Sequence, residues 1–203
     1  TIARLRQDLQ RQPGRAVLRQ QLAIALNNYG VELSDRKEWA AAVEQLSDAV
    51  ELEPQNTQFR KNLATTYINQ AQQLHQQHQT NDALAALEHA LAADPNLAAA
   101  YQLRGQIEYD RQHLKEAKAA WQQSLQLDPH QDDVQTLLAQ VSEELPVESK
   151  FDRLSQAYFD LRYEEQVERP AGFDVRDALL QARREVGGDF AYWPKHKIVV
   201  LLY

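Results

Sequence analysis

The sequence Ala-Val-Glu-Leu-Glu-Pro at residues 49–54 returns as Ala-Leu-Ala-Ala-Asp-Pro at residues 90–95 and as Ser-Leu-Gln-Leu-Asp-Pro at residues 124–129. A weaker copy, Asp-Leu-Gln-Arg-Gln-Pro, stands at residues 8–13. The closing prolines are therefore at positions 13, 54, 95 and 129, with spacings of 41, 41 and 34 residues. Repetition at such intervals indicates an array of similar structural units.

Each unit contains two blocks of apolar residues at the spacing of an α-helix. In the second block a small alanine precedes a large side chain by four positions, as Ala42 precedes Leu46, and such a pair lets two helices approach closely. The closing proline cannot continue the second helix. The sequence therefore predicts a chain of helix pairs. In the first unit the two blocks are Leu18, Leu22, Ala25, Tyr29 and Leu33, then Trp39, Ala42, Val43, Leu46, Ala49 and Val50.

The composition favours a mostly α, water-soluble protein. The 203 residues include six Gly and seven Pro, and 43% are hydrophobic. A net charge of −7 disfavours nucleic-acid binding, and the absence of Cys excludes disulfides and thiolate metal sites. No stretch approaches the roughly 20 apolar residues that span a bilayer, so no membrane insertion is expected. The composition leaves open whether the protein is cytoplasmic or exported.

The repeated units resemble the tetratricopeptide repeat, whose helix A carries a Leu-Gly or Leu-Ala pair and whose helix B carries Ala, an aromatic residue or Leu, then Ala and Pro. The resemblance covers residues 1 to about 145 and implies an α-solenoid, a superhelix of helix pairs. Units one and two exceed unit three by seven residues, about two helical turns, so their first helices are expected to project beyond the stack. The residues at these positions are Leu22, Ala23, Ala42, Leu46, Ala49 and Pro54; Leu63, Ala64, Ala83, Leu87, Ala90 and Pro95; and Arg104, Gly105, Ala117, Trp121, Ser124 and Pro129, of which Arg104 departs from the usual Leu.

The predicted domain organisation follows from these repeats. A partial repeat (1–15), three repeats (16–56, 57–97 and 98–131) and a capping helix (132–145) make up a helical array over residues 1–145. The capping helix has one apolar face for the last repeat and one polar face for water. Residues 146–150 are expected to be a linker before a β-α-β segment at 151–203.

The C-terminal segment departs from the helical pattern. Residues 158–163 alternate apolar and polar side chains with aromatics, and residues 197–203 form a nearly continuous apolar run, so both are predicted strands. Between them, residues 173–186 have helical spacing and end at Gly187-Gly188. A β-α-β unit of this size leaves sheet edges uncovered, so we expect it either to pack on the repeats or to begin a larger α+β domain.

This segment is similar to the entry of peptidase MA-like (gluzincin) metallopeptidase domains, which often follow tetratricopeptide arrays in bacterial proteins. The likeness rests on the aromatic first strand, the helix that closes on Val-Gly-Gly, the turn with Phe190, Tyr192 and Pro194, and the final apolar strand. That family uses an H-E-x-x-H helix to bind zinc, and this sequence contains no such motif. The chain is therefore expected to be non-catalytic and to need no cofactor or metal.

Other candidate chemistry has a simpler structural interpretation. His75 and His78 lack a third good ligand, so a solvated helix end is favoured over a metal site. His113 and Glu116 at a helix start suit stabilisation of the first turn better than acid-base catalysis. Asp132-Asp133 is interpreted as helix capping. Trp39 and Trp121 are expected in the core, and Trp193 is left open, with the interface between the β-α-β segment and the helices as one place for it.

The resemblance implies a concave surface lined by the first helix of each repeat. Its predicted side chains are mostly amides and hydroxyls, which suit an extended peptide backbone. Related domains that bind acidic chaperone tails use Lys, Arg and Asn at set positions, of which only Asn62 matches here, so a chaperone-tail clamp is disfavoured. Partial filling of this groove by the C-terminal segment stays an alternative. The predicted groove residues are Gln20, Ile24, Asn27, Lys61, Thr65, Asn69, Gln102, Gln106 and Tyr109.

Two functional hypotheses follow. The first is a non-catalytic scaffold that binds a protein or peptide and forms the N-terminal part of a larger bacterial protein with a zinc-peptidase-like domain. The absence of any Met agrees with a chain excised from a longer one. The second is a self-standing adaptor that forms homo-oligomers by pairing its C-terminal strand, residues 198–203.

Overall fold

A computed structural model of the chain describes residues 1–148, 151–155, 159–164, 175, 177–185 and 198–202. The chain divides into two compact units, residues 1–138 and 139–203. The fold is mostly α, as predicted. The helices are α1 (Ile2–Arg11), α2 (Ala16–Asp35), α3 (Trp39–Leu52), α4 (Thr57–Gln76), α5 (Thr80–Ala93), α6 (Ala98–Asp110), α7 (Leu114–Leu127) and α8 (Asp132–Glu148).

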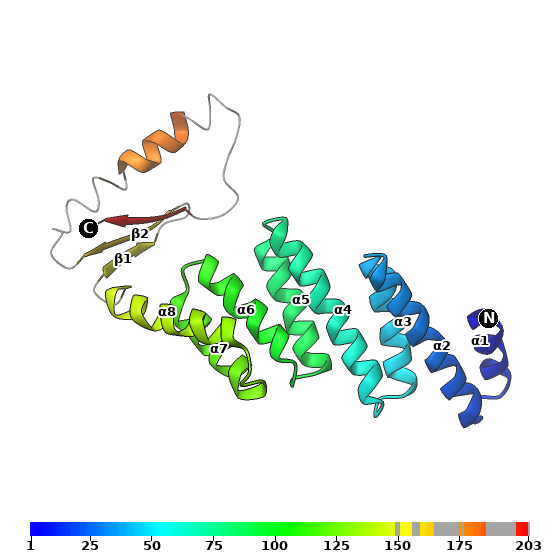
Figure 1. Cartoon of the computed structure of the whole chain (residues 1–203). Coiled ribbons are helices and arrows are strands. Elements are labelled where there is room, and N and C mark those ends of the chain that lie inside the picture. Colours follow the sequence, from blue (N-terminus) through cyan, green and yellow to red (C-terminus); the bar gives the residue numbers. More distant parts are fainter. Residues whose placement is uncertain (149–150, 156–158, 165–174, 176, 186–197, 203) are drawn as a thin grey trace. The chain divides into compact units, whose positions relative to one another are not determined.

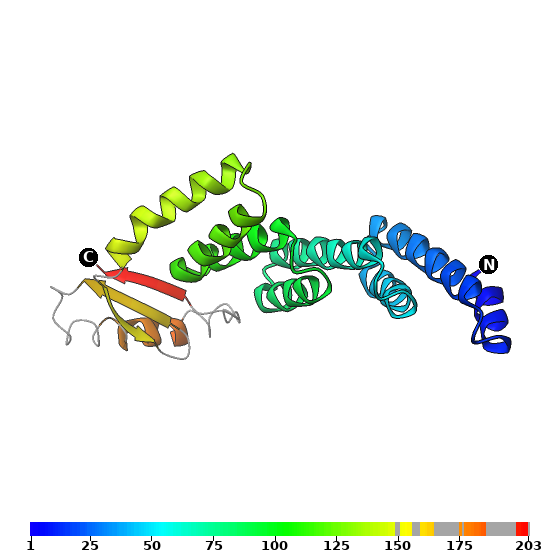
Figure 2. The same ribbon diagram turned by 90° about the horizontal axis from the view of Figure 1, so that it is seen from below.

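The first unit is a row of helix pairs, visible in both ribbon views (Figure 1, Figure 2). Helices α2 and α3, α4 and α5, and α6 and α7 pack as successive pairs, and the first helices of neighbouring pairs also touch, as α2 touches α4 and α4 touches α6. Helix α1 packs on α2 in the place of a preceding second helix. The predicted succession of helix pairs is thus confirmed for these repeats.

The three turns within the pairs have one geometry. Each turn spans three residues, and the middle one, Lys37, His78 or Gln112, has a φ of 59–61°. In the first turn the Lys37 N–H donates to the Ser34 carbonyl (2.9 Å) and the Glu38 N–H donates to the Leu33 carbonyl (3.0 Å). The other two turns repeat this pattern of a Schellman motif, which satisfies carbonyls at the end of the first helix.

The extra length of repeats one and two lies in their first helices, as predicted. Helices α2 and α4 have 20 residues, α6 has 13, and α3, α5 and α7 have 14 each. At 1.5 Å per residue, α2 and α4 are about 30 Å long against about 21 Å for their partners. Since the turns within the pairs are identical, the additional two turns of helix lie at the N-terminal ends of α2 and α4.

This placement corrects the alignment of the repeats. Counted back from the turn, Gly105 corresponds to Ala71 and Gly30, seven positions after the Ala64 and Ala23 of the predicted match. A Cβ on Gly30 would lie 2.6 Å from Cγ of Leu46, and one on Gly105 would overlap the Trp121 indole. Ala71 is fully buried. The small residue of each first helix is therefore required where the second helix crosses it, which in repeats one and two is seven positions later than the sequence pattern predicts.

The core of the array is made of alanines interleaved with large side chains. Trp121, Leu46 and Leu87 are fully buried, and Ala42, Ala83 and Ala117 lie four positions before them, also fully buried. Trp121 is a core residue as predicted, whereas Trp39 is only partly buried and donates from Nε1 to Oε1 of Gln73 (3.1 Å). Val134, near the start of α8, is fully buried as well.

The second unit contains a three-stranded sheet in the order β1-β2-β3. Strand β1 (Phe151–Ser155) is antiparallel to β2 (Phe159–Glu164), which is parallel to β3 (Ile198–Leu202). A helix at residues 177–185 lies between β2 and β3 in sequence, so the predicted β-α-β order is present and β1 was missed. Phe159 and Leu161, which share one face of β2, are buried. Gly187-Gly188 and the turn with Phe190, Tyr192 and Pro194 lie outside the described residues.

Candidate functional site

The central groove lies on the first helices of repeats two and three and reaches the start of α8. It encloses a cavity of about 340 Å³. Helix α6 supplies its floor, while α4 and α8 supply the two sides. The lining residues are Ile68 and Gln72 of α4, Ala99, Gln102, Leu103 and Gln106 of α6, Trp121 of α7, and Asp133 and Leu137 of α8.

The polar groups of the central groove are mainly amides. Gln102 donates from Nε2 to Oδ2 of Asp133 (2.8 Å), which links α6 to α8 across the cavity. Gln106 donates from Nε2 to Oδ1 of Asp110 (2.8 Å). The described lining contains one carboxylate and neither Lys nor Arg. Such a site offers donors and acceptors between apolar patches without a positive charge.

The predicted groove residues are not all placed together. Gln102 and Gln106 line the central groove, and Tyr109 packs against Trp121 with ring centroids 5.6 Å apart. Lys61, Thr65 and Asn69 are exposed on α4, and Gln20 and Ile24 are exposed on α2, all outside this cavity. Counted back from the turns, the equivalents of Gln102 and Gln106 are Ile68 and Gln72, which do line the cavity and which the sequence prediction missed.

Asn27 belongs to a polar contact between repeats one and two. It is buried, and its Oδ1 accepts from Nδ2 of Asn62 (2.8 Å). Oδ1 of Asn62 in turn accepts from Nε2 of Gln58 (2.8 Å). Asn62, the one residue that matches the chaperone-tail pattern, therefore has both amide atoms engaged within the chain.

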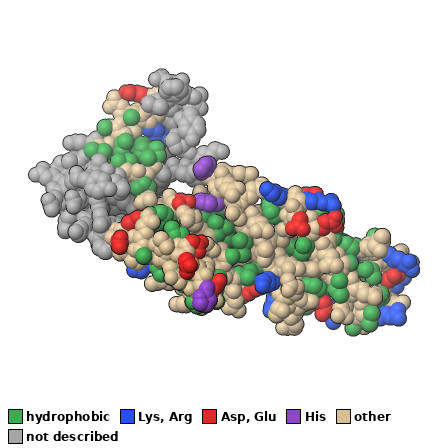
Figure 3. All heavy atoms as spheres, viewed as in Figure 1, with side chains coloured by type: hydrophobic (Ala, Val, Ile, Leu, Met, Phe, Trp, Pro, Cys, Tyr) green, Lys and Arg blue, Asp and Glu red, His purple; other side chains and the backbone are tan. Residues whose placement is uncertain are grey.

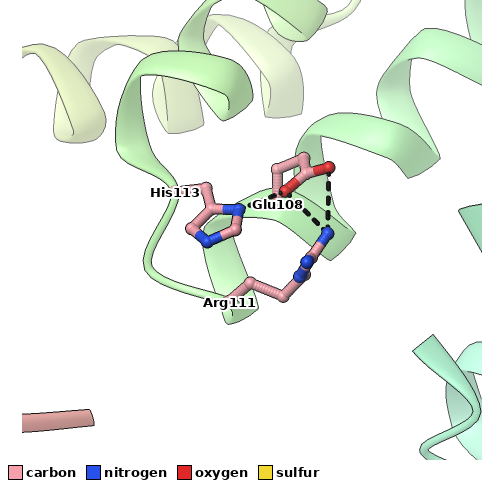
Figure 4. Close-up of polar contacts among 3 residues, drawn as sticks. All are labelled: Glu108, Arg111 and His113. Atoms are coloured by element: carbon pink, nitrogen blue, oxygen red, sulfur yellow. Dashed lines mark hydrogen bonds and ion pairs between the residues drawn. The ribbon is translucent and has the colours of Figure 1, made fainter. Parts of the chain in front are cut away.

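His113 pairs with Glu108 instead of acting with Glu116. The Glu108 carboxylate is buried and accepts from Arg111 Nη1 (3.3 Å), and its Oε2 lies 2.9 Å from His113 Nδ1 (Figure 4). Glu108 lies in the last turn of α6, and Arg111 and His113 are the first and last residues of the turn to α7, where the His113 N–H also donates to the Glu108 carbonyl (2.8 Å). This cluster holds the turn closed, which is a structural role.

The remaining candidates have structural roles as well. Nε2 of His75 lies 3.0 Å from Oδ2 of Asp110, so this histidine contributes a contact between α4 and α6. No group of three His, Asp or Glu side chains that could hold a metal occurs in the part of the chain that the structure describes. Asp132 and Asp133 stand in the first turn of α8, where carboxylates stabilise a helix. No described helix has the length and apolar character needed to cross a membrane.

Several solved tetratricopeptide domains are similar to part of the chain. The first tetratricopeptide domain of Spaghetti (RPAP3), solved with an HSP90 peptide, is 22% identical with a TM-score of 0.43, covering 63% of this chain and 95% of its own. The first such domain of human RPAP3 is 22% identical (TM-score 0.41; 62% and 93% covered). The corresponding domain of Arabidopsis OM64 is 19% identical (TM-score 0.43; 62% and 98% covered). No curated protein sequence matches the chain. Residues 98–131 match the family described as tetratricopeptide repeat, and the chain therefore contains a repeat of this family over α6 and α7.

Proposed function

We propose that the chain is a non-catalytic interaction scaffold whose central groove binds an extended peptide segment of a partner protein. The observation that carries this proposal is the cavity of about 340 Å³ lined by first helices of successive repeats. Ile68, Leu103 and Leu137 offer apolar contacts, and Gln72 and Gln102 bring amides to the same lining. An extended backbone exposes donors and acceptors that such amides satisfy at little desolvation cost.

The charges of the groove favour a neutral or basic segment. Asp133 is the charged residue among the described lining residues, and it is exposed at the start of α8. An acidic peptide would lose hydration there without gaining a cationic partner, whereas a donor or cation could approach the carboxylate. The chain as a whole also carries a net charge of −7. On the face drawn in Figure 3, most of the surface of the helix array is uncharged.

A random heptapeptide library selected on the full chain tests this function. We expect enrichment of sequences with an apolar residue and no net negative charge, and their addition should shift the backbone amide signals of residues 99–106 in heteronuclear NMR spectra. The acidic HSP90 peptide Ser-Arg-Met-Glu-Glu-Val-Asp serves as a comparison and should bind more weakly. A selection that enriches nothing, or peptides that shift only signals outside the groove, would contradict the proposal.

The wider context remains a prediction from the C-terminal resemblance. According to this prediction, the chain is the N-terminal part of a bacterial protein that continues into a zinc-peptidase-like domain. The parallel β2–β3 pair with an intervening helix is compatible with an entry segment of this kind. Immunodetection in the source cells checks this prediction, because a native protein that continues into such a domain should be clearly larger than 23.3 kDa.

A further inference from the structure

A second cavity lies on the other side of α4, between α3 and α5. It has a volume of about 460 Å³. On α4 it is lined by residues 67, 70 and 74, whereas the central groove is lined by residues 68 and 72. Because consecutive helical residues are about 100° apart, these two sets face nearly opposite directions. We call this cavity the α3–α5 pocket; it is lined by Ala40, Val43, Tyr67, Gln70, Leu74, Asp82, Ala85, Ala86 and His89.

Alanines keep the α3–α5 pocket open. Ala40 of α3 and Ala85 and Ala86 of α5 end at Cβ, so no side chain from these positions fills the space beside Tyr67. The apolar surface continues through Val43 and Leu74. Ala40 and Ala85 are exposed, which makes the cavity accessible from solvent.

An aromatic pair forms part of the pocket wall. The rings of Tyr67 and His89 are stacked, with centroids 5.3 Å apart and planes inclined by 28°. Burial raises the pKa of the Tyr67 phenol above its ordinary value of 10.0, so the ring stays neutral. The face of a neutral tyrosine ring attracts a cation, and a guanidinium stacks on such a face particularly well.

The two helices that flank the pocket are acidic. Helices α3 and α5 together carry five carboxylates and neither Lys nor Arg. Asp48 is paired with Arg6, but no hydrogen bond or ion pair engages the Asp82 carboxylate within the described residues. Helix α7, which occupies the equivalent place in repeat three, carries Lys115 and Lys118 together with Glu116. The five carboxylates are Glu44, Asp48, Glu51, Asp82 and Glu88.

Repeat three carries a cation at a position equivalent to one in the pocket lining. Counted back from the turns, Gln70 of α4 corresponds to Arg104 of α6, and Tyr67 corresponds to Tyr101. Arg104 is exposed in the structure. Repeat three thus bears an arginine where the α3–α5 pocket has an uncharged amide, so the pocket leaves its carboxylate and its aromatic pair to an outside cation.

We propose that the α3–α5 pocket is a second docking site, separate from the central groove, and that it takes an arginine side chain from a basic segment of a partner protein. The aliphatic stem of the arginine lies along Val43, Leu74 and Ala86, while its guanidinium stacks on the Tyr67–His89 pair and meets Asp82. Arginine fits better than lysine because its planar head stacks and forms two parallel hydrogen bonds to a carboxylate. The scaffold then holds two segments at once, one on each side of α4.

The test uses the full chain and the N-acetylated, C-amidated peptide Gly-Ser-Leu-Arg-Leu-Ser-Gly, followed by amide NMR shifts. We expect saturable shifts in residues 83–90, and about tenfold weaker binding when citrulline replaces the arginine, because citrulline keeps the shape and loses the charge. D82N should weaken binding at least about fivefold, and E88Q, an equal charge change on the same helix outside the lining, should weaken it less than about twofold.

Two further variants test the charge of the pocket and its free volume separately. Q70R places a cation in the pocket and should abolish binding; α6, another first helix of the array, carries Arg104 at the equivalent position. A85Y fills the pocket from an exposed position, with A119Y on α7 as its control, and only A85Y should abolish binding. Shifts confined to the central groove, equal effects of D82N and E88Q, or unchanged binding to A85Y would each overturn the proposal. None of these results depends on whether the central groove binds a peptide.

Discussion

Gly105 and Trp121 set the closest approach between α6 and α7. Trp121 is fully buried, and its Nε1 donates to the Gln102 carbonyl (3.2 Å), so the indole lies directly over the backbone of α6. A Cβ on Gly105 would overlap the indole, whose hydrogen bond and burial leave it little freedom to move. The same relation holds between Gly30 and Leu46, so glycine here is a packing requirement.

The variant G105A should be destabilised by about 1–2 kcal/mol, since an overpacking cost near the upper end of about 1–3 kcal/mol exceeds the roughly 1 kcal/mol that alanine gains in helix propensity. Urea denaturation followed by circular dichroism measures the change. Gly14 is the matched control, because a Cβ there meets nothing within 4 Å, and G14A should lie within about 0.5 kcal/mol of wild type. Equal stabilities of the two variants would show that the indole is not fixed in place.

At the scale of elements, the turn that closes each helix pair is the most regular feature of the array. Helix number, helix type and approximate bounds follow from the sequence because proline spacing and apolar periodicity are strong local signals. The position of the two extra helical turns does not follow from the sequence, because Ala23 and Ala64 satisfy the small-residue pattern as well as Gly30 and Ala71 do. Only the turn, which has the same geometry in all three helix pairs, shows which small residue of the first helix faces the second helix. Strand β1 was missed because five residues after a helix carry too short a pattern.

The variant K37G should stabilise the protein by about 0.5–1 kcal/mol, because glycine adopts the left-handed conformation without the steric cost that lysine bears. Lys37 is exposed with φ of 61°, so no packing is lost. The urea concentration at the midpoint of unfolding should rise, while the dependence of the unfolding free energy on urea concentration should stay unchanged. K37A removes the same charge and keeps Cβ, so a similar rise in K37A would assign the effect to charge and contradict the explanation by strain.

At the scale of the whole molecule, the candidate site was only partly predictable. Gln102 and Gln106 were found because repeat three has the usual length, so the pattern of related proteins transfers to it directly. Ile68 and Gln72 were missed because the longer helix α4 shifts the sequence pattern by two turns. The α3–α5 pocket left no signal in the sequence, since it depends on three alanines and an aromatic pair that packing brings together from three helices.

The function proposed for this chain depends on the central groove being its peptide-binding surface. Its most direct test is the Kd of a library-selected heptapeptide, by isothermal titration calorimetry, for wild type, A99W and A119W. Ala99 and Ala119 are both exposed helical alanines, but only Ala99 lines the groove. We predict that A99W weakens binding at least about tenfold while A119W stays within about twofold of wild type, because the new indole occupies the ligand's volume. Equal Kd values for A99W and A119W would contradict the claim.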